Sequence, residues 1–183
     1  MNSSSRLASL IASPAAGFEQ PFEMMAACHE RLLRTLGLLE RLRAHVARHG
    51  ADPQAQQAAR DVMRYFDMAA PQHHLDEEMH VFPALIERGD PPVLALVARL
   101  QQDHLQMEAR WRMVRAILER VAHADIHAVP APDASEIDAF TRLYGAHIEA
   151  EEQIAYPAAV ALLDDGARNA MGTEMRRRRG AAS

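Results

Sequence analysis

Cysteine, aromatic residues and long hydrophobic runs are all scarce in this chain of 183 residues. A single cysteine, Cys28, excludes a disulfide within the chain and is typical of a protein kept in a reducing cytoplasm. No apolar run approaches the roughly 20 residues that a membrane-spanning helix needs. The N-terminus also lacks the basic and apolar regions of a signal peptide. These features predict a cytoplasmic protein that does not bind membranes.

Charge and composition narrow the class further. The net charge is −5 and the sequence pI is about 6.0, so we expect no broad nucleic-acid-binding face. Hydrophobic residues make up 49% of the chain and aromatic residues only 5%, a composition that favours helices over strands. The basic run at residues 176–179 lies near the end of the chain and is interpreted as a frayed, solvated tail.

Apolar spacing and helix-breaking residues predict four long helices and a short fifth one. They are expected at about 21–49, 53–87 with a bend at Pro71, 92–124, 135–163 and 167–178. Ser135 with Asp138 is expected to cap the fourth helix. Residues 1–17 would form a flexible arm, residues 18–165 the helical domain, and residues 166–183 a short helix and basic tail. The predicted fold class is all-α, an up-down-up-down four-helix bundle with a possible short C-terminal helix.

Two stretches of eleven residues repeat one another. Residues 73–83 read His-His-Leu-Asp-Glu-Glu-Met-His-Val-Phe-Pro, and residues 147–157 read His-Ile-Glu-Ala-Glu-Glu-Gln-Ile-Ala-Tyr-Pro. The first His, both Glu residues and the Pro coincide, and an aromatic residue precedes each Pro. Because residues four apart share a helix face, His73 should point with Glu77, and His147 with Glu151.

This spacing of His and Glu is more frequent than chance allows. Chance placement of 10 His and 14 Glu in 183 residues gives about 0.8 cases of Glu four residues after His. Four such pairs occur, at 73/77, 74/78, 104/108 and 147/151. A ladder of solvated salt bridges is the alternative explanation for one pair. The matched stretches instead favour a metal site, because an imidazole beside a carboxylate suits a transition-metal ion.

The two halves of the chain place further histidines at matching distances. His29 lies 44 residues before His73, and His104 lies 43 residues before His147. Two helix pairs related by a pseudo-twofold axis would bring these side chains together in the core. With Glu108, which follows His104 at the same spacing, seven side chains could bind metal. One octahedral ion cannot use seven such ligands, so two ions bridged by Glu77 and Glu151 are expected. Iron fits this donor set best, with manganese or zinc as alternatives. The predicted metal ligands are His29, His73, Glu77, His104, Glu108, His147 and Glu151.

The matched stretches, with the lone His before each, resemble those of the hemerythrin-like family, the His/His/Glu cation-binding domains. The resemblance covers about residues 22–163. It implies two non-haem iron ions, oxo-bridged when oxidised. It also implies a role in oxygen carriage or sensing, nitric oxide handling, or iron and redox responses, with O2 or NO as the expected small partner. The positions that match family ligands are His29, His73, Glu77, His104, His147 and Glu151.

Glu108 departs from the pattern of the oxygen carriers, which have a second His one turn after the His of the third helix. A third carboxylate is expected to favour ferric iron and to weaken reversible oxygen carriage. The leading hypothesis is therefore a di-iron protein that binds or senses a small ligand, redox state or iron. A di-iron peroxidase, oxidase or nitric-oxide reductase is the alternative, and a metal-free helical interaction module is the third. Catalysis, a homodimer and a protein partner are left open.

Four other residues have weaker signals. His74 projects about 100° from its neighbour and is expected at the rim of the site, since the second stretch has Ile at the matching position. His49 is an alternative ligand at the end of the first helix. Tyr144 lies one turn before a predicted ligand and could donate a hydrogen bond to the site. Cys28 is interpreted as a buried, inert thiol.

Overall fold

The regular structure of the described part of the chain is entirely helical. The computed structural model describes residues 17–181, and no strand occurs among them. The predicted all-α class is confirmed, whereas the arm expected over residues 1–17 falls almost wholly outside the described residues. The elements are α1 (Pro21–His49), α2 (Pro53–Asp76), η2 (Glu77–Val81), α3 (Phe82–Arg88), α4 (Pro91–Ala122), α5 (Ala131–Ala150), η3 (Glu151–Ala155), α6 (Tyr156–Leu162) and α7 (Asp165–Arg178).

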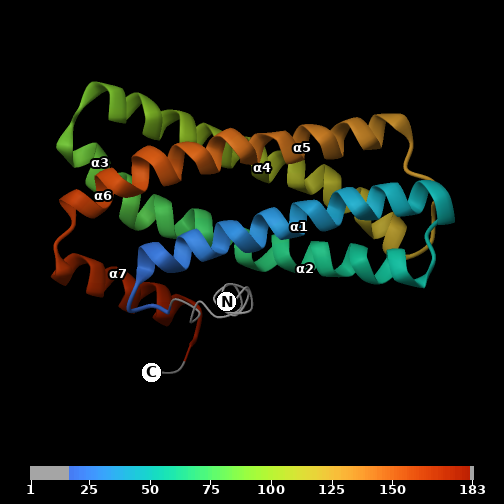
Figure 1. Cartoon of the computed structure of the whole chain (residues 1–183), viewed down its shortest axis with the longest axis horizontal. Helices are drawn as coiled ribbons and strands as arrows, with labels where there is room; N and C mark the ends of the chain where they lie inside the picture. The colour runs from blue at the N-terminus through green and yellow to red at the C-terminus, as the bar shows by residue number, and fades with distance from the viewer. Residues whose placement is uncertain (1–16, 182–183) are drawn as a thin grey trace, which may run out of the picture.

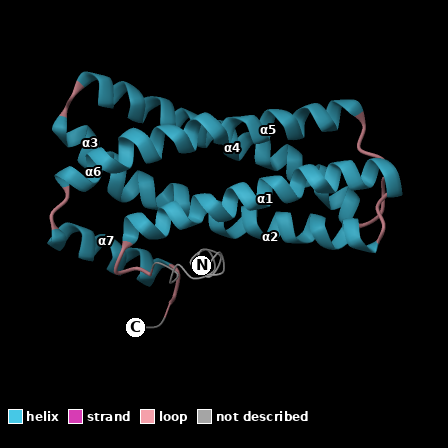
Figure 2. Cartoon of the chain, viewed as in Figure 1, coloured by secondary structure: helices cyan, strands magenta, loops and turns pink. Residues whose placement is uncertain are grey.

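The long helices α1, α2, α4 and α5 run side by side along the longest axis of the molecule (Figure 1). α1 packs on α2, α2 on α4, and α4 on α5. Short loops join the helices at the two ends of the molecule (Figure 2). This arrangement is consistent with the expected bundle. Among residues 17–181, none of the helices combines the length and apolar character required to cross a membrane.

The ends of α1 and α2 follow residues that favour them. α1 begins at Pro21 and ends before Gly50, whose φ of +73° lies in the left-handed region that glycine adopts without strain. The Asp52 carboxylate accepts a hydrogen bond from the backbone N–H of Ala55 at 2.8 Å and so caps α2. These boundaries agree with those predicted from the sequence.

α5 begins earlier than predicted. Its first residue is Ala131, and the hydroxyl of Ser135 donates to the Ala131 carbonyl at 3.0 Å instead of capping a helix. Pro132 falls in the first turn of α5, where a missing N–H breaks no helical hydrogen bond. The loop expected through Pro132 is therefore the first turn of the helix.

The second and fourth helical segments each contain a π-helical turn that the sequence did not predict. Pro71 lies within α2, and the hydrogen-bonding pattern changes from α-helical to π-helical only at η2. There the backbone N–H of Phe82 donates to the carbonyl of Glu77, five residues back, and in η3 Tyr156 donates to Glu151 in the same way. Each π turn thus begins at one of the predicted bridging carboxylates.

Pro83 and Pro157 account for the position of these turns. Each lies at the second residue of the helix that follows, and neither has an N–H to donate. A wider turn moves the preceding carbonyls away from the proline ring, which would clash with them in a regular α-helix. The wider turn also brings the residue five positions after each Glu, an aromatic residue, onto the same face as that Glu.

The apolar core lies on both sides of a polar layer. On α1, Met25 precedes His29 and belongs to one apolar cluster, while Leu32 follows it and belongs to the other. On α4, Leu100 and Met107 flank His104 in the same way. The polar side chains are therefore enclosed by packed hydrocarbon, where unpaired charges are costly.

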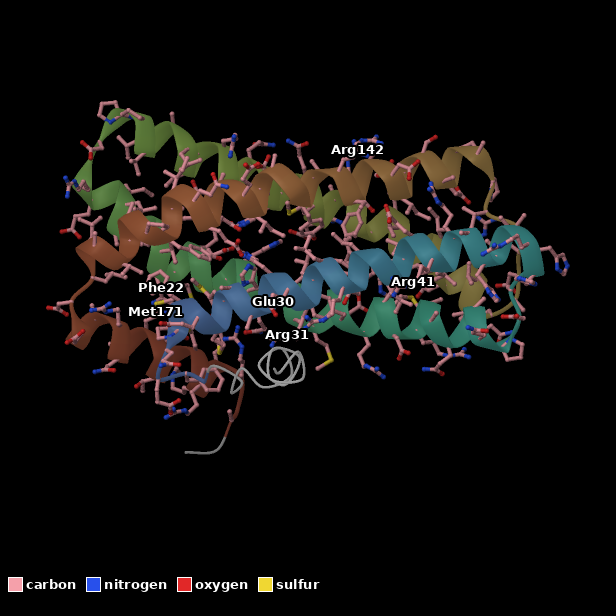
Figure 3. All side chains as sticks on the ribbon, viewed as in Figure 1. Phe22, Glu30, Arg31, Arg41, Arg142 and Met171 are labelled. Carbon is pink, nitrogen blue, oxygen red and sulfur yellow. The ribbon has the colours of Figure 1, made fainter. Side chains whose placement is uncertain are left out.

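α7 is part of this core. Met171 and Met175 are buried in the same cluster as Phe22 of α1, and Phe22 and Met171 lie close together in Figure 3. Gly172 is required there, since a Cβ at this position would lie 1.8 Å from the carbonyl oxygen of Phe18. The short, packed C-terminal helix expected from the sequence is present.

The interpretation of the basic run as a frayed tail is wrong for its last two members. The guanidinium groups of Arg178 and Arg179 each donate to the Asp76 carboxylate at 2.6 Å. Asp76 is 1% exposed, so the run supplies the cations that a buried carboxylate needs. Arg177, at 79% exposure, is the solvated member, whereas Arg176, at 28% exposure, forms an ion pair with Glu19.

Candidate metal centre

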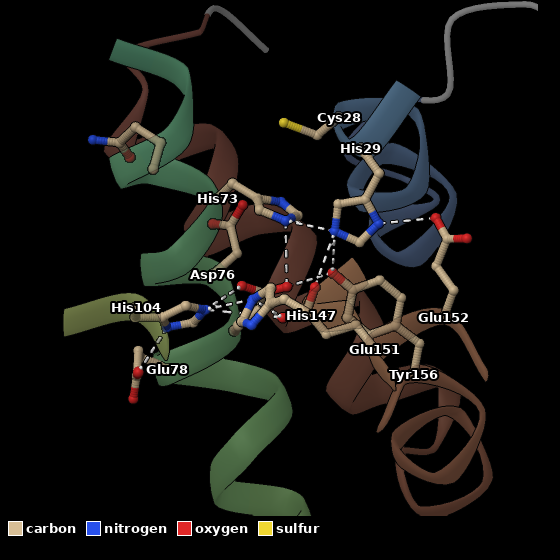
Figure 4. A network of polar contacts seen from close by, with 12 residues as sticks. Cys28, His29, His73, Asp76, Glu78, His104, His147, Glu151, Glu152 and Tyr156 are labelled. Atoms are coloured by element: carbon tan, nitrogen blue, oxygen red, sulfur yellow. Dashed lines mark hydrogen bonds and ion pairs between the residues drawn. The ribbon is translucent and has the colours of Figure 1, made fainter. Parts of the chain in front are cut away.

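Six of the seven predicted ligands converge in the polar layer. Figure 4 shows the four imidazoles and Glu151 turned toward one another. The six predicted ligands come from α1, α2, η2, α4, α5 and η3, and all six side chains are buried. Every imidazole turns its Nε2 atom toward the carboxylates of the cluster. The six residues are His29, His73, Glu77, His104, His147 and Glu151.

The first group of ligands, here called the His29 position, consists of His29, His73 and one oxygen from each of two carboxylates. The Nε2 atoms of His29 and His73 are 2.9 Å apart. Glu77 Oε1 lies 3.3 Å from His73 Nε2, and Glu151 Oε2 lies 3.2 Å from His29 Nε2. One ligand atom from each of these four residues can be chosen so that all lie within 4.8 Å of one another.

The second group, here called the His104 position, uses the remaining oxygens of the same two carboxylates. The Nε2 atoms of His104 and His147 are 3.2 Å apart. Glu77 Oε2 lies 3.3 Å from His104 Nε2, and Glu151 Oε1 lies 2.7 Å from His147 Nε2. Glu77 and Glu151 therefore each turn one oxygen to each group, which is the arrangement of bridging carboxylates.

The donor atoms are incompletely satisfied by one another. Glu77 Oε2 and both oxygens of Glu151 are buried and have no partner with hydrogen-bond geometry among the described residues. Buried polar groups are normally paired, so these orphaned atoms fit cations bound between them.

Ionisation in the cluster reflects burial and close opposite charges. Burial lowers the pKa of His73 to about 3, helped by the neighbouring His29, so this imidazole is neutral and able to bind a metal. Burial also opposes ionisation of Glu151, but the imidazoles of His104 and His147 close to its carboxylate hold its pKa well below its usual range. Glu151 is therefore an ionised carboxylate, as a metal ligand must be.

Comparison with known proteins agrees with this geometry. A model of the hemerythrin HHE cation binding domain matches residues 20–159, which include all six converging side chains. The chain belongs to this family. A relative described as an uncharacterized protein of Haemophilus influenzae is 28% identical over 139 residues, which are 76% of this chain and 78% of the relative. Hemerythrin HHE domains bind metal cations, and the two groups of buried His and Glu residues have the chemistry and spacing to hold them.

Glu108, the seventh predicted ligand, lies outside this hemerythrin-like cluster. Its side chain is 68% exposed and forms an ion pair with Arg112 at 3.5 Å. One helical turn after His104, the inward place is taken by Met107, which is 1% exposed. Burying the thioether there costs far less than burying a further carboxylate, so the helix turns Glu108 to solvent.

Three carboxylates that are not among the candidate ligands each contact the Nδ1 atom of one imidazole. His29 Nδ1 lies 2.9 Å from Glu152, His104 Nδ1 lies 3.0 Å from Glu78, and His147 Nδ1 lies 3.3 Å from Asp103. Such contacts fix the ring orientation and make the imidazole a stronger metal ligand. The sequence contained a signal for Glu78 and Glu152, since both matched stretches have a second Glu, but none for Asp103.

Tyr156 is a further residue that the sequence did not assign to the site. Its hydroxyl donates a hydrogen bond to Glu77 Oε1 and lies 3.3 Å from His29 Nε2, and its ring stacks on that of His29. The matching residue of the other half, Phe82, stacks on His104 but has no hydroxyl. The repeated aromatic residue before each Pro was the signal for these rings.

The weaker candidates lie outside the cluster. His74 stacks on His104 with ring centroids 4.0 Å apart and is therefore at the rim, as expected. His49 is exposed at the end of α1 beside His45. Tyr144 is buried among Phe66 and Phe140 in the apolar core, with no hydrogen bond to the ligands.

Proposed function

We propose that this chain is a non-haem di-iron protein that binds or senses a small ligand, O2 or NO, or the redox or iron state of its surroundings. The observation that carries the proposal is that Glu77 and Glu151 are shared between two buried groups of four ligands. Imidazole and carboxylate ligands without thiolates suit iron, and they also accept manganese or zinc. Bound iron would supply electron exchange and coordination positions open to a small ligand.

We assign the ligands to the six converging residues and leave out Glu108, because its carboxylate faces solvent. The proposed domain covers residues 18–165 as an up-down-up-down four-helix bundle. Residues 166–183 would then be a C-terminal addition that packs against it through α7. A cytoplasmic location remains a prediction from the cysteine content.

A cleft beside the centre supports a small-molecule ligand. The cleft has a volume of about 410 Å³ and lies between α2 and α4, and His104 is part of its wall. Apolar side chains such as Phe66 and Trp111 form most of the remaining wall. The cleft is more than ten times larger than the ~30 Å³ that a water molecule occupies in the liquid, so a diatomic gas fits within it.

The second candidate function is a di-iron redox enzyme of the peroxidase, oxidase or nitric-oxide reductase type. The observation in its favour is the hydroxyl of Tyr156 within the ligand cluster. A buried phenol held between Glu77 and His29 can hold or pass a proton at its oxygen atom during a reaction. No such group is needed for simple ligand binding.

The experiment is to load the protein anaerobically with ferrous iron and add NO, or O2, in substoichiometric steps. A binder or sensor gives one spectral change that saturates at a fixed ratio of ligand to protein. An enzyme consumes added reductant over many turnovers. Absence of any spectral change with both gases, in protein that has bound iron, would contradict both functions. Unchanged thermal stability in strong chelator, with no iron bound, would indicate a metal-free interaction module.

A further inference from the structure

The two metal positions have different surroundings, although their ligand sets match. The pseudo-twofold relation pairs His29 with His104, His73 with His147, and Glu77 with Glu151. Each position therefore has two imidazoles and one oxygen from each bridging carboxylate. Differences between the positions must then arise from the residues behind the ligands.

The first difference lies in the residue that precedes the His of the first and third long helices. At the His104 position this residue is Asp103, and its carboxylate lies 3.3 Å from His147 Nδ1. At the His29 position the matching residue is Cys28, whose thiol instead lies 3.5 Å from the hydroxyl of Tyr65. A neutral thiol is a poor acceptor compared with a carboxylate.

His73 consequently lacks the support that His147 has. Its Nδ1 atom is buried and has no hydrogen-bond partner among the described residues. The two remaining imidazoles do not break the symmetry, because His29 is held by Glu152 and His104 by Glu78. At the His104 position a carboxylate thus contacts the Nδ1 atom of both imidazoles. At the His29 position a carboxylate contacts the Nδ1 atom of only one imidazole.

The second difference is the hydroxyl of Tyr156. It donates a hydrogen bond to Glu77 Oε1, the oxygen that faces the His29 position. The oxygen that faces the His104 position, Oε2, has no such donor among the described residues. A hydrogen bond to Oε1 competes with a cation for the same lone pairs and so weakens that oxygen as a ligand.

We propose that the His104 position binds the first metal ion tightly and that the His29 position binds a second, exchangeable ion. The inference rests on the proposed function, since it assumes that both positions are metal sites. A carboxylate behind a metal-bound imidazole typically changes metal affinity by about 10- to 100-fold. The chain then responds to the free concentration of a divalent transition metal through occupancy of its His29 position.

The test is calorimetric titration of the metal-free protein with Co²⁺, a redox-stable probe of imidazole and carboxylate ligation. Wild type should show two steps whose dissociation constants differ by about tenfold or more. In Asp103→Asn the tighter step should weaken by about 10- to 100-fold and approach the other. Asp61→Asn, which changes a partly exposed aspartate of α2 far from the site, is the matched control and should leave both steps unchanged.

The reverse change is Cys28→Asp, which gives the His29 position the carboxylate that it lacks. We expect the weaker step to tighten, while Cys28→Ser, of similar size but without charge, should not alter it. Removal of one ligand identifies the steps: His73→Ala should keep the tighter step, and His147→Ala only the weaker one. If Cys28→Asp does not fold, Asp103→Asn and the two ligand variants still test which position binds metal more tightly.

Two equal steps, or an Asp103→Asn variant in which both steps weaken alike, would overturn the inference while leaving a two-ion centre. Retention of the weaker step in His73→Ala would overturn the assignment of the positions. Binding of fewer than two ions by wild type would instead contradict the proposed function. The two failures are therefore distinguishable.

Discussion

Glu77 and His104 hold protons that a metal ion must displace. Burial raises the pKa of Glu77 to about 7, and the nearby charge of Glu151 raises it further. Burial alone would lower the pKa of His104, but the nearby carboxylates of Glu151 and Glu77 outweigh it and raise the pKa to about 10. Both values lie above those of an unfolded chain, so the metal-free fold binds extra protons, which lowers its stability as pH rises through these ranges.

Metal loading should therefore release protons, and more of them at low pH. Near pH 6 the Glu77 carboxyl and the His104 imidazolium are both protonated, and the pKa of His29 is also raised, so at least two protons should leave on loading. Near pH 8 Glu77 is largely ionised, so about one proton fewer should leave. Titration of the protein with Zn²⁺ in weakly buffered solution at a series of pH values measures the number. Equal release at pH 6 and pH 8 would contradict the shifted pKa of Glu77.

The convergence of single side chains on the site was predictable wherever helical spacing and a repeat agreed. His73 with Glu77, and His147 with Glu151, are four residues apart in matched stretches, and all four converge. Spacing alone was insufficient for Glu108, because Met107 offers the same helix an apolar side chain for the inward place. Whether Met107 or Glu108 faces inward depends on the side chains of the neighbouring helices. The spacing of residues within one helix does not reveal these side chains.

At the level of elements, α7 is joined by ion pairs to α2, which carries the proposed ligand His73. Arg178 and Arg179 both donate to Asp76, which is buried three residues after His73. Arg178 also pairs with Glu174, whose pKa is lowered to about 2 by hydrogen bonds from Arg178 and His80. The sequence predicted the helix, but the partner of its basic end is distant in the chain and could not be predicted.

Replacing both arginines by methionine should leave the Asp76 carboxylate buried without a cation. Loss of the partners of a buried charge costs about 3 kcal/mol or more of unfolding free energy. Urea unfolding of the metal-free Arg178→Met/Arg179→Met variant measures this loss. Arg177→Met is the matched control, because that side chain is 79% exposed and should change the stability by less than about 0.5 kcal/mol. Equal stability of both variants would show that Asp76 does not depend on α7.

The π turns were the elements that the sequence did not predict. Helix periodicity predicted continuous helices through η2 and η3, and their prolines indicated only where a regular helix would be disturbed. The π turns begin at Glu77 and Glu151 and widen the backbone there. They thereby place Phe82 and Tyr156 against the imidazoles. Whether a π turn forms depends on packing across the cluster, so spacing rules based on 3.6 residues per turn do not predict it.

Over the whole molecule, the all-α class and the polar layer followed from the sequence, whereas the surroundings of the layer did not. The repeat of a lone His and a His-x-x-x-Glu stretch predicted that two halves meet in the core, and the structure brings those side chains together. Asp103 joins the site from a position outside the matched stretches. Tyr156 lies at a repeated aromatic position, but the repeat did not predict a role for its hydroxyl, which Phe82 lacks. Their roles follow only from the packing of the halves against each other.

The proposed centre holds two metal ions bridged by Glu77 and Glu151, and counting the metal ions in each chain is its sharpest test. The protein is loaded anaerobically with ferrous iron, freed of excess metal, and analysed for iron per chain, alongside Glu77→Gln and the exposed control Glu108→Gln. We expect two ions per chain in wild type and in Glu108→Gln, and fewer in Glu77→Gln, since an amide is a poor bridging ligand. One ion or none in wild type, or two ions retained in Glu77→Gln, would contradict it.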